Sequence, residues 1–364
     1  MPRLELKPAD TVVFREAKPL GAFGGSEVQS QFPPPGRTVQ GALRTMLGDR
    51  HEIDWQAEQW PQWIGDSEQS GAVRFAGPYL HDADTQEIYL PLPAMIVRRN
   101  DDNAQGCERL KPSEKVYLTD QGRLRLPTAA QSVKDLHDCY VSAATLQKIL
   151  DGTLPAAGEI RPLSDFYADE VHTSVALDPT TRVARESMLF QLMHVRLKPG
   201  ISIVIDVADS KEYTLPQSGL LRFGARGRLA GFSTVAEQKS LPAGRMAGKH
   251  AFVTFVTPAD FGGKAFPEGA VRERRGDADA WTIEAHGVRF SVVCAAGAKP
   301  LPEGGYDLRG RQGRAVRMLV PAGTTWFIEY SGDLADLARK LSGRHLGLRT
   351  ENGYGQVVVG SYNT

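Results

Sequence analysis

The sequence has little cysteine and no excess of charge of either sign, and both features exclude certain kinds of site. Only three cysteines occur in 364 residues, and Cys107, Cys139 and Cys294 lie far apart. Their odd number and wide spacing suit neither a disulfide framework nor a CxxC metal site, so they indicate a reducing compartment. Lysine and arginine total 43, as do aspartate and glutamate. Because the formal net charge is zero, any attraction to nucleic acid must come from local basic patches.

Long apolar runs are missing as well. No stretch reaches membrane-spanning length, and the first residues lack the apolar core of a signal peptide. These absences predict a cytoplasmic protein with no membrane contact. The length of 364 residues is enough for two domains of ordinary size. The Pro-Ala-Ala-Gly segment at 155–158 is the expected linker, which predicts an N-terminal domain at 1–158 and a C-terminal domain at 159–364.

Charge is unevenly distributed along the chain, although it sums to zero. Residues 49–68 hold six acids, one arginine and three tryptophans, Trp55, Trp60 and Trp63. This stretch predicts a helix that packs its indoles inward, or a contact with a partner protein, because tryptophan is enriched at binding hot spots. Two other stretches are basic, namely 222–249 with Arg222, Arg226, Arg228, Lys239, Arg245 and Lys249, and 309–317 with Arg309, Arg311, Arg314 and Arg317.

A glycine-rich stretch near the C-terminus connects a helical pattern at 333–341 to a valine-rich strand pattern at 356–359. Its glycines permit positive φ and close backbone approach, and successive N–H groups in such a loop favour anions. The order of helix, loop and strand differs from that of the Walker and dinucleotide fingerprints, so a mononucleotide site is not expected. Four side chains suit a single-stranded nucleic acid, three by charge and one as a stacking face: Arg344, His345, Arg349 and Tyr354. The same stretch also suits a plain connection that binds nothing.

A second anion site is expected near the N-terminus. The pattern predicts a strand over 10–15, a Gly- and Pro-rich loop over 19–36 and a helix over 38–47. Thr38 is placed to cap this helix, and the free N–H groups of a helix N-terminus favour anions. Arg37 and Arg44 are expected to reach an anion held there.

The rest of the chain reads mainly as strands. Residues 174–185 and 186–197 predict a hairpin with a long arm, and 142–150 predicts a helix. The polar stretch at 98–106 predicts a mobile loop. Further strands are expected at 201–207, 251–257, 290–294, 316–320 and 326–330. This distribution favours an α+β fold of two ferredoxin-like (RRM-like, βαββαβ) domains with hairpin insertions and a C-terminal Gly-rich loop.

Several motifs in fixed order carry a resemblance to a known family. They include Gln31-Phe32-Pro33-Pro34-Pro35, Thr38-Val39-x-Gly41-Ala42-Leu43-Arg44, Gly77-Pro78-Tyr79-Leu80, Thr181-Arg182-Val183-Ala184-Arg185, Leu221-Arg222-Phe223-Gly224 and Gly353-Tyr354-Gly355. Over nearly the whole chain, the sequence resembles the RAMP superfamily of CRISPR proteins. It is most similar to the third subunit of the Cmr complex, the type III-B effector.

The resemblance implies a non-catalytic RNA-binding subunit that acts in antiviral defence. Such a subunit binds the 5′ handle of crRNA and docks on the large polymerase-palm subunit and on a backbone RAMP subunit. It also implies that a hairpin at 172–186 lies along the guide RNA, although an ordinary surface hairpin fits the residues too. Together with the charges described above, it points to twelve RNA-binding residues: Arg37, Thr38, Arg44, Arg182, Arg222, Arg226, Arg228, Arg344, His345, Arg349, Asn352 and Tyr354. The N-terminal and C-terminal glycine-bearing turns are expected to clasp one unpaired RNA segment.

Enzymatic chemistry is not expected, and neither is a metal or a cofactor. None of the eight histidines lies in a motif that assigns it to catalysis. His194 falls in an apolar strand pattern and is expected to be packed in the core. His345 beside the glycine loop suits a hydrogen-bond donor to phosphate or a general base. Two alternatives stay open. One is a metal-independent endoribonuclease that processes the guide precursor, and the other is the equivalent subunit of a type III-A or III-D complex.

Overall fold

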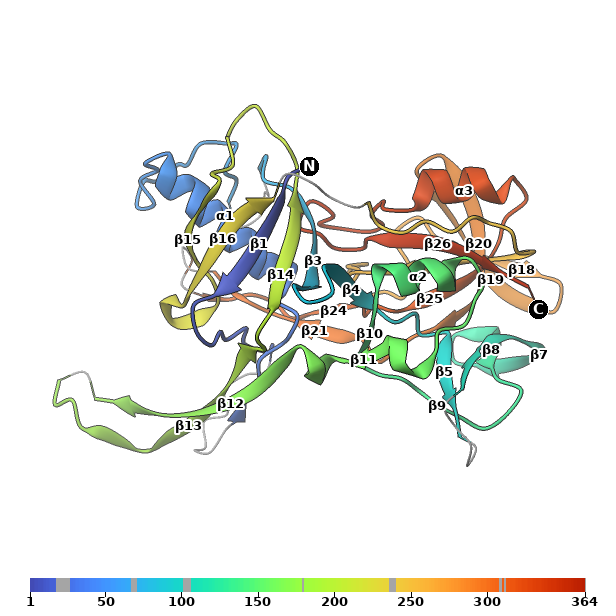
Figure 1. Cartoon of the computed structure of the whole chain (residues 1–364), viewed down its shortest axis with the longest axis horizontal. Coiled ribbons are helices and arrows are strands. Elements are labelled where there is room, and N and C mark those ends of the chain that lie inside the picture. The colour runs from blue at the N-terminus through green and yellow to red at the C-terminus, as the bar shows by residue number, and fades with distance from the viewer. Residues whose placement is uncertain are drawn as a thin grey trace. The chain divides into compact units, whose positions relative to one another are not determined.

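The computed structural model describes residues 1–17, 27–66, 71–100, 106–178, 180–235, 240–307, 310 and 312–363, with the backbone alone at 176 and 185–189. Most elements are strands, and the described residues contain three α-helices (Figure 1). The chain divides into two compact units that interleave in sequence. Unit 1 comprises Met1–Asp84, Ser164–Gln238 and Pro302–Arg317, and unit 2 comprises Thr85–Leu163, Lys239–Leu301 and Met318–Thr364. This division does not follow the single boundary at residue 158 that the sequence suggested.

Unit 1 is built on an antiparallel sheet. Its strands follow the order β3 (Phe75–Asp82), β14 (Ile201–Val207), β1 (Arg3–Pro8), β16 (Leu229–Val235) and β15 (Ser218–Arg222). The helix α1 (Gly36–Arg50) buries Val39, Leu43 and Leu47, which recur every three to four residues and so lie on one face. The expected helix over 38–47 is confirmed. Its N-cap is Pro35 and not Thr38, because the helix begins two residues earlier than the pattern indicated.

The expected strand over 10–15 is wrong. The first strand is β1 at Arg3–Pro8, and residues 10–15 form only isolated bridges, including that of Val12 with Val195. Val12, Val13 and Phe14 are nevertheless buried, which explains the apolar pattern. The N–H of Phe14 donates to a side chain, Ser30 Oγ at 3.0 Å, and not to the backbone of a neighbouring strand.

A long hairpin leaves the sheet of unit 1. It consists of β12 (Tyr167–Leu177) and β13 (Ala184–Leu197), and the two-residue strand β2 (Glu27–Val28) pairs with β13 in parallel. Figure 1 shows it extending well beyond the other strands of its unit. The hairpin predicted from the sequence is confirmed and begins earlier, at Tyr167. Short pairs in the segment 301–319 are β21 (Leu301–Glu303) with β24 (Arg317–Leu319) and β22 (Tyr306–Asp307) with β23 (Gln312–Gly313).

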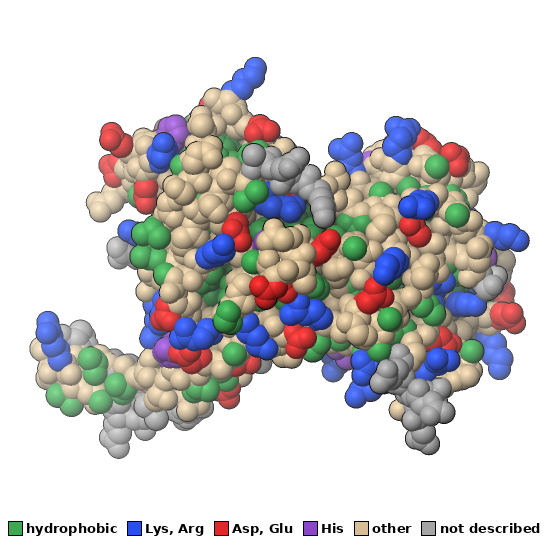
Figure 2. Space-filling model, viewed as in Figure 1, with side chains coloured by type: hydrophobic (Ala, Val, Ile, Leu, Met, Phe, Trp, Pro, Cys, Tyr) green, Lys and Arg blue, Asp and Glu red, His purple; other side chains and the backbone are tan. Residues whose placement is uncertain are grey.

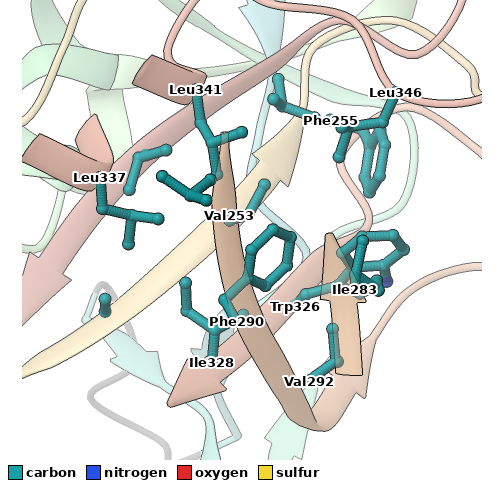
Figure 3. Close-up of a cluster of buried hydrophobic side chains, with 14 of the residues drawn as sticks. Val253, Phe255, Ile283, Phe290, Val292, Trp326, Ile328, Leu337, Leu341 and Leu346 are labelled. Atoms are coloured by element: carbon teal, nitrogen blue, oxygen red, sulfur yellow. The ribbon is translucent and has the colours of Figure 1, made fainter. Parts of the chain in front are cut away.

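Unit 2 contains a six-stranded antiparallel sheet. The order is β18 (Val271–Arg275), β19 (Ala278–Ala285), β20 (Val288–Ala296), β25 (Thr325–Glu329), β17 (His250–Phe255) and β26 (Val357–Tyr362). The helix α3 (Leu334–Leu341) is capped by Asp333, whose side chain accepts from the N–H of Ala335. Its Leu337 and Leu341 pack on the sheet with Val253, Phe290 and Trp326 (Figure 3). The last helix and last strand of the sequence prediction are therefore confirmed.

The remaining elements of unit 2 are short. The strand β10 (Cys139–Ser142) pairs with β4 (Glu87–Pro91) and with β11 (Ile160–Pro162). A three-stranded sheet has the order β6 (Cys107–Arg109), β5 (Ile96–Arg99) and β9 (Val133–Lys134). The strands β7 (Lys111–Thr119) and β8 (Gly122–Thr128) form a hairpin, and the helix is α2 (Ala143–Leu150). Ser142 caps α2 by accepting from the N–H of Thr145, so the predicted helix is confirmed. The predicted loop at 98–106 overlaps β5 at residues 98–99 and ends just before β6, and its residues 101–105 lie outside the described part.

The mixed α and β content and the antiparallel sheets agree with the expected fold class. A βαββαβ unit would place two helices on its sheet, and among the described residues unit 1 has α1 alone. The specific pair of ferredoxin-like domains therefore stays a prediction. The helix expected in the tryptophan-rich stretch is wrong within residues 51–66, which form turns and bends. None of the helices among the described residues is long and apolar enough to cross a bilayer.

Candidate nucleic-acid interface

A tight turn at 223–228 connects β15 to β16 and is fixed to the interior of unit 1. The ring of Phe223 packs edge-on against Phe14 with centroids 5.1 Å apart, and the N–H of Ala225 donates to the carbonyl of Val13 at 2.9 Å. Gly224 has φ of 87°, and a Cβ at this position would lie 2.9 Å from the Val13 carbonyl oxygen. Only glycine fits there, so the turn holds a defined shape.

The turn presents Arg226 against the long hairpin. Arg226 has a left-handed φ of 61° and is exposed. Its Nη1 donates to Ser174 Oγ on β12 at 3.1 Å, and its guanidinium lies 5.5 Å from the ring centre of Phe190 on β13. The turn and the hairpin therefore form one surface, which we call the hairpin–turn surface: residues 174, 190 and 224–228. No described residue forms an ion pair with Arg226, so its charge is available to an anion.

Arg182 and Arg222 are also exposed and without an ion pair among the described residues. Arg182 lies in the turn of the hairpin with a φ of 56°, and its N–H donates to the carbonyl of Asp178 at 2.8 Å. Arg222 ends the edge strand β15. Figure 2 shows apolar and basic side chains together on the projecting hairpin. Val171, Leu177 and Val183 contribute to this apolar surface, each more than half exposed.

Arg228, by contrast, belongs to a network of charges at the root of the hairpin. Its Nη1 lies 2.9 Å from Asp10 Oδ2, and Arg196 bridges Asp10 at 3.0 Å and Glu170 at 2.6 Å. Hydrogen bonds from Arg196 and then from His172 hold the pKa of the Glu170 carboxyl below its usual value. Two arginines facing two carboxylates leave little net charge for a ligand.

Two stacked imidazoles complete this root. His172 and His194 lie parallel with ring centroids 3.8 Å apart, and His172 Nε2 is 2.6 Å from Glu170 Oε1. His194 is 1% exposed, which confirms its predicted core position, and its Nδ1 bonds with Thr11 Oγ1 at 2.8 Å. Burial, together with the nearby charges of His172 and the two arginines of the turn, lowers the pKa of His194 to about 4. This histidine is therefore neutral near pH 7.

The arginines at the start of α1 are occupied by other contacts within unit 1. Arg37 Nε lies 3.7 Å from the buried Glu303, and Arg44 Nη1 donates to the carbonyl of Asp66 at 2.7 Å. Burial lowers the pKa of Arg44, against the opposing effect of Asp66. Thr38 is half-buried, and its N–H donates to the Pro35 carbonyl. An anion at this helix end would have to compete with these partners.

In unit 2, the glycine-rich loop folds tightly on itself. Gly343, Gly347, Gly353 and Gly355 all have positive φ. A Cβ on Gly355 would overlap the carbonyl oxygen of Leu346, so no side chain fits there. The loop is further fixed because the Gly355 N–H donates to the Pro258 carbonyl at 2.8 Å. Its backbone N–H groups are thus partly used inside the protein.

A buried ion pair organises this loop. Arg349 Nε and Nη2 lie 2.8 and 2.6 Å from Oδ2 of Asp260, which is fully buried. The Arg349 guanidinium also covers the ring of Tyr354 at 4.9 Å from its centre. Tyr354 is 2% exposed and Asn352 is 3% exposed. A base therefore cannot stack on Tyr354 in this arrangement, because Arg349 and the loop already occupy its surroundings, and Arg349 is neutralised by Asp260.

His345 and Arg344 lie at the edge of the same loop. His345 Nδ1 bonds with the Tyr354 carbonyl at 2.8 Å, and the His345 carbonyl is 2.8 Å from His286 Nε2. Burial lowers the pKa of His345, only partly offset by the hydrogen bond to Tyr354. Arg344 is exposed and forms no ion pair with a described residue. Among the charged residues predicted for this loop, Arg344 is the one best placed to meet a phosphate.

The structure therefore sorts the twelve predicted residues into three places. Arg182, Arg222, Arg226 and Arg228 lie on or beside the hairpin, Arg37, Thr38 and Arg44 on α1, and Arg344, His345, Arg349, Asn352 and Tyr354 in the C-terminal loop. The two glycine-bearing turns belong to different units, and a shared RNA segment stays a prediction. Sequence reasoning missed Asp260, which lies 89 positions from Arg349, so no local pattern signals the pair. Within the described residues, no group of three or more His, Cys, Asp or Glu side chains is arranged to hold a metal ion.

Two solved structures with a similar fold are chains of type III-B Cmr-beta complexes. One cryo-EM chain of a type III-B Cmr-beta complex bound to cognate target RNA is 13% identical, with 97% of this chain and 95% of that chain covered and a TM-score of 0.52. Another, from the type III-B Cmr-beta complex bound to cognate target RNA and AMPPnP, is 12% identical, covers 89% and 86% and has a TM-score of 0.50. None of the curated proteins matches the sequence.

The fold is thus one that subunits of RNA-bound CRISPR complexes use. The sequence identifies the family, because the model of the CRISPR-associated protein family Cas_Cmr3 matches residues 4–362. The chain belongs to this family, and the resemblance drawn from its motifs is confirmed.

Proposed function

We propose that this protein is a non-catalytic, RNA-binding subunit of a type III-B CRISPR effector complex in antiviral defence. In this role it holds the 5′ handle of crRNA and docks on the large polymerase-palm subunit and a backbone RAMP subunit. Membership of the Cas_Cmr3 family supports the assignment to a Cmr complex. The cryo-EM complexes with a similar chain are described as bound to target RNA, which supports RNA as a partner.

The observation that carries the RNA-binding role is the exposed Arg226 on the hairpin–turn surface, which forms no ion pair with a described residue. Its turn is rigid because Gly224 and Ala225 fix the backbone to Val13, so the guanidinium needs little ordering when it binds. Phe190 beside it offers a ring face, and a splayed base stacks well on aromatic and guanidinium planes. Arg182 extends the positive charge along the hairpin.

Handle binding by the assembled complex tests this role. Replacing Arg226 or Arg182 by alanine removes a charge-assisted hydrogen bond to phosphate, for which we expect about tenfold weaker binding per site, corresponding to about 1.5 kcal/mol. The slope of the logarithm of affinity against the logarithm of salt concentration should become shallower by roughly 0.7 for each phosphate that is no longer neutralised. The measurement is filter binding of repeat-derived handle RNA over a salt series.

Arg289→Ala is the matched control. Arg289 is an exposed arginine of unit 2 that pairs with Glu273 at 3.2 Å and lies outside the hairpin–turn surface. It should leave affinity and salt slope unchanged. Equal affinities for wild type, Arg226→Ala and a variant with both Arg226→Ala and Arg182→Ala would remove the hairpin–turn surface from RNA binding.

A further inference from the structure

The strand β15 leaves one edge of the unit 1 sheet open. It is the last strand in that sheet and pairs only with β16 among the described strands. Two hydrogen bonds fix the register, from the Phe223 N–H to the Arg228 carbonyl at 2.7 Å and from the Thr234 N–H to the Gln217 carbonyl at 2.7 Å. Backbone groups of an antiparallel strand alternate between its two sides. The N–H and C=O groups of Ser218, Leu220 and Arg222 therefore point away from β16 to the open edge.

The side chains of these same three residues are exposed. Leu220 is 66% exposed, and Leu229, diagonally across on β16, is 43% exposed. The alternate residue Leu221 is 3% exposed on the opposite face. Figure 2 shows apolar side chains gathered over the part of the molecule where Figure 1 places β15 and β16. Unpaired backbone groups on a strand edge are a template for pairing with another chain, and exposed apolar side chains beside them favour such pairing.

Two other edge strands among the described residues carry features that discourage pairing. In unit 2, β18 has the sequence Val-Arg-Glu-Arg-Arg, so four of its five residues are charged. The edge strand β11 ends in Pro162. Charges and proline keep an edge from pairing with another chain. Against this background β15, with the sequence Ser-Gly-Leu-Leu-Arg and a regular register, lacks such protection except at its last residue.

We propose that an extended segment of a partner protein adds to β15 as a new antiparallel strand, with apolar residues at alternate positions and a carboxylate opposite Arg222. The alternating N–H and C=O groups fit the backbone of a peptide and not that of RNA. Arg222 has no ion pair among the described residues, so it supplies the charge that a carboxylate complements. If a second copy of β15 paired symmetrically about Leu220, its Ser218 would lie opposite Arg222, and Arg222 would have no carboxylate partner. The proposal rests on the proposed function in one respect, because the partner is another subunit of the effector.

Hydrogen exchange on the isolated chain and on the reconstituted complex tests the strand addition. The outward amides of residues 218, 220 and 222 should exchange at least about tenfold more slowly in the complex. Those of β18 should not change. Equal exchange of the β15 amides in both samples would overturn the proposal. Protection that appears in the isolated chain and grows with its concentration would identify a second copy as the occupant and overturn the assigned partner.

Two substitutions sharpen the test. Leu220→Pro removes an N–H that makes no bond within the protein, so the fold is retained while strand addition is blocked. Leu220→Lys keeps the N–H but places a charge on the apolar surface. Each should weaken binding of the chain to the other purified subunits by about tenfold or more. The control, Val271→Lys on β18, changes a 55% exposed edge residue and should have no effect.

The outcomes separate this proposal from the RNA-binding role. If Leu220→Pro assembles as the wild type does, strand addition is wrong whatever the RNA data show. If the arginine variants of the hairpin–turn surface leave handle affinity unchanged while β15 becomes protected in the complex, the RNA role fails and strand addition stands.

Discussion

Replacing Asp260 by alanine is expected to destabilise unit 2 strongly. Asp260 is fully buried, its Oδ2 accepts a hydrogen bond from Arg349 Nε at 2.8 Å and lies 2.6 Å from Arg349 Nη2, and its Oδ1 accepts the N–H of Gly262 at 3.0 Å. The Arg349 side chain is 14% exposed, so water cannot replace the lost carboxylate fully. Leaving one member of a buried ion pair without its partner costs about 3–5 kcal/mol. We expect a loss of that size in the free energy of unfolding.

The assay is urea denaturation, combined with hydrogen exchange at the amide of Leu348. This amide donates to the Asp260 carbonyl at 2.8 Å and so reports on the loop itself. Glu273→Ala is the control, because it removes a carboxylate from arginines that are 43% and 67% exposed, where an ion pair contributes about 0–1 kcal/mol. The Thr282 hydroxyl, which also donates to Glu273, keeps its hydrogen bond with Ser291 Oγ at 3.0 Å.

A double variant, Asp260→Leu with Arg349→Met, separates the pair from its two charges. Replacing both members by apolar side chains avoids a lone buried charge, so the double variant should be more stable than Asp260→Ala. If Asp260→Ala unfolds within about 0.5 kcal/mol of the Glu273→Ala control, the pair does not organise the loop. A structural role for Arg349 would then be wrong, and the RNA contact predicted for it from the sequence would be favoured instead.

Three further predictions concern the loop, the hairpin root and catalysis. Gly355→Ala should lower the free energy of unfolding by more than about 2 kcal/mol, because its Cβ would overlap the Leu346 carbonyl. Gly343→Ala has a φ of 77° but open space around it, so it should cost about 1 kcal/mol. Equal losses in urea denaturation would contradict the packing described for Gly355. Because the pKa of His194 is lowered to about 4, from about 6.5 when unfolded, its neutral form contributes stability above about pH 6.5 that is lost as the pH falls toward 4. Between pH 7 and pH 5 the free energy of unfolding should fall by about 1–2 kcal/mol in the wild type and by less in His194→Gln. Parallel stability profiles of the two proteins over this pH range would contradict a lowered pKa of His194. Purified protein with repeat RNA in EDTA should leave the RNA intact, and cleavage abolished by His345→Ala would show a nuclease instead.

Much of the local structure follows from short-range patterns. Val39, Leu43 and Leu47 repeat with helical spacing and are buried on one face of α1, and Ser142 and Asp333 cap α2 and α3. These signals involve residues within a few positions of each other, so the sequence is sufficient to read them. The segment at 10–15 shows the limit, because its apolar pattern correctly indicated burial but could not tell a strand from an irregular buried segment.

The sequence by itself determined the family, the mixed fold class, the long hairpin and which basic residues are candidates for RNA binding. Which of those residues keep a free charge was decided only by the tertiary structure. Arg226 and Arg349 look alike in the sequence, each within two positions of a glycine, yet one is exposed and the other is paired with Asp260, 89 positions away. Ion pairing depends on distance in space and on burial, and chain folding brings distant residues together without any local pattern that reveals it.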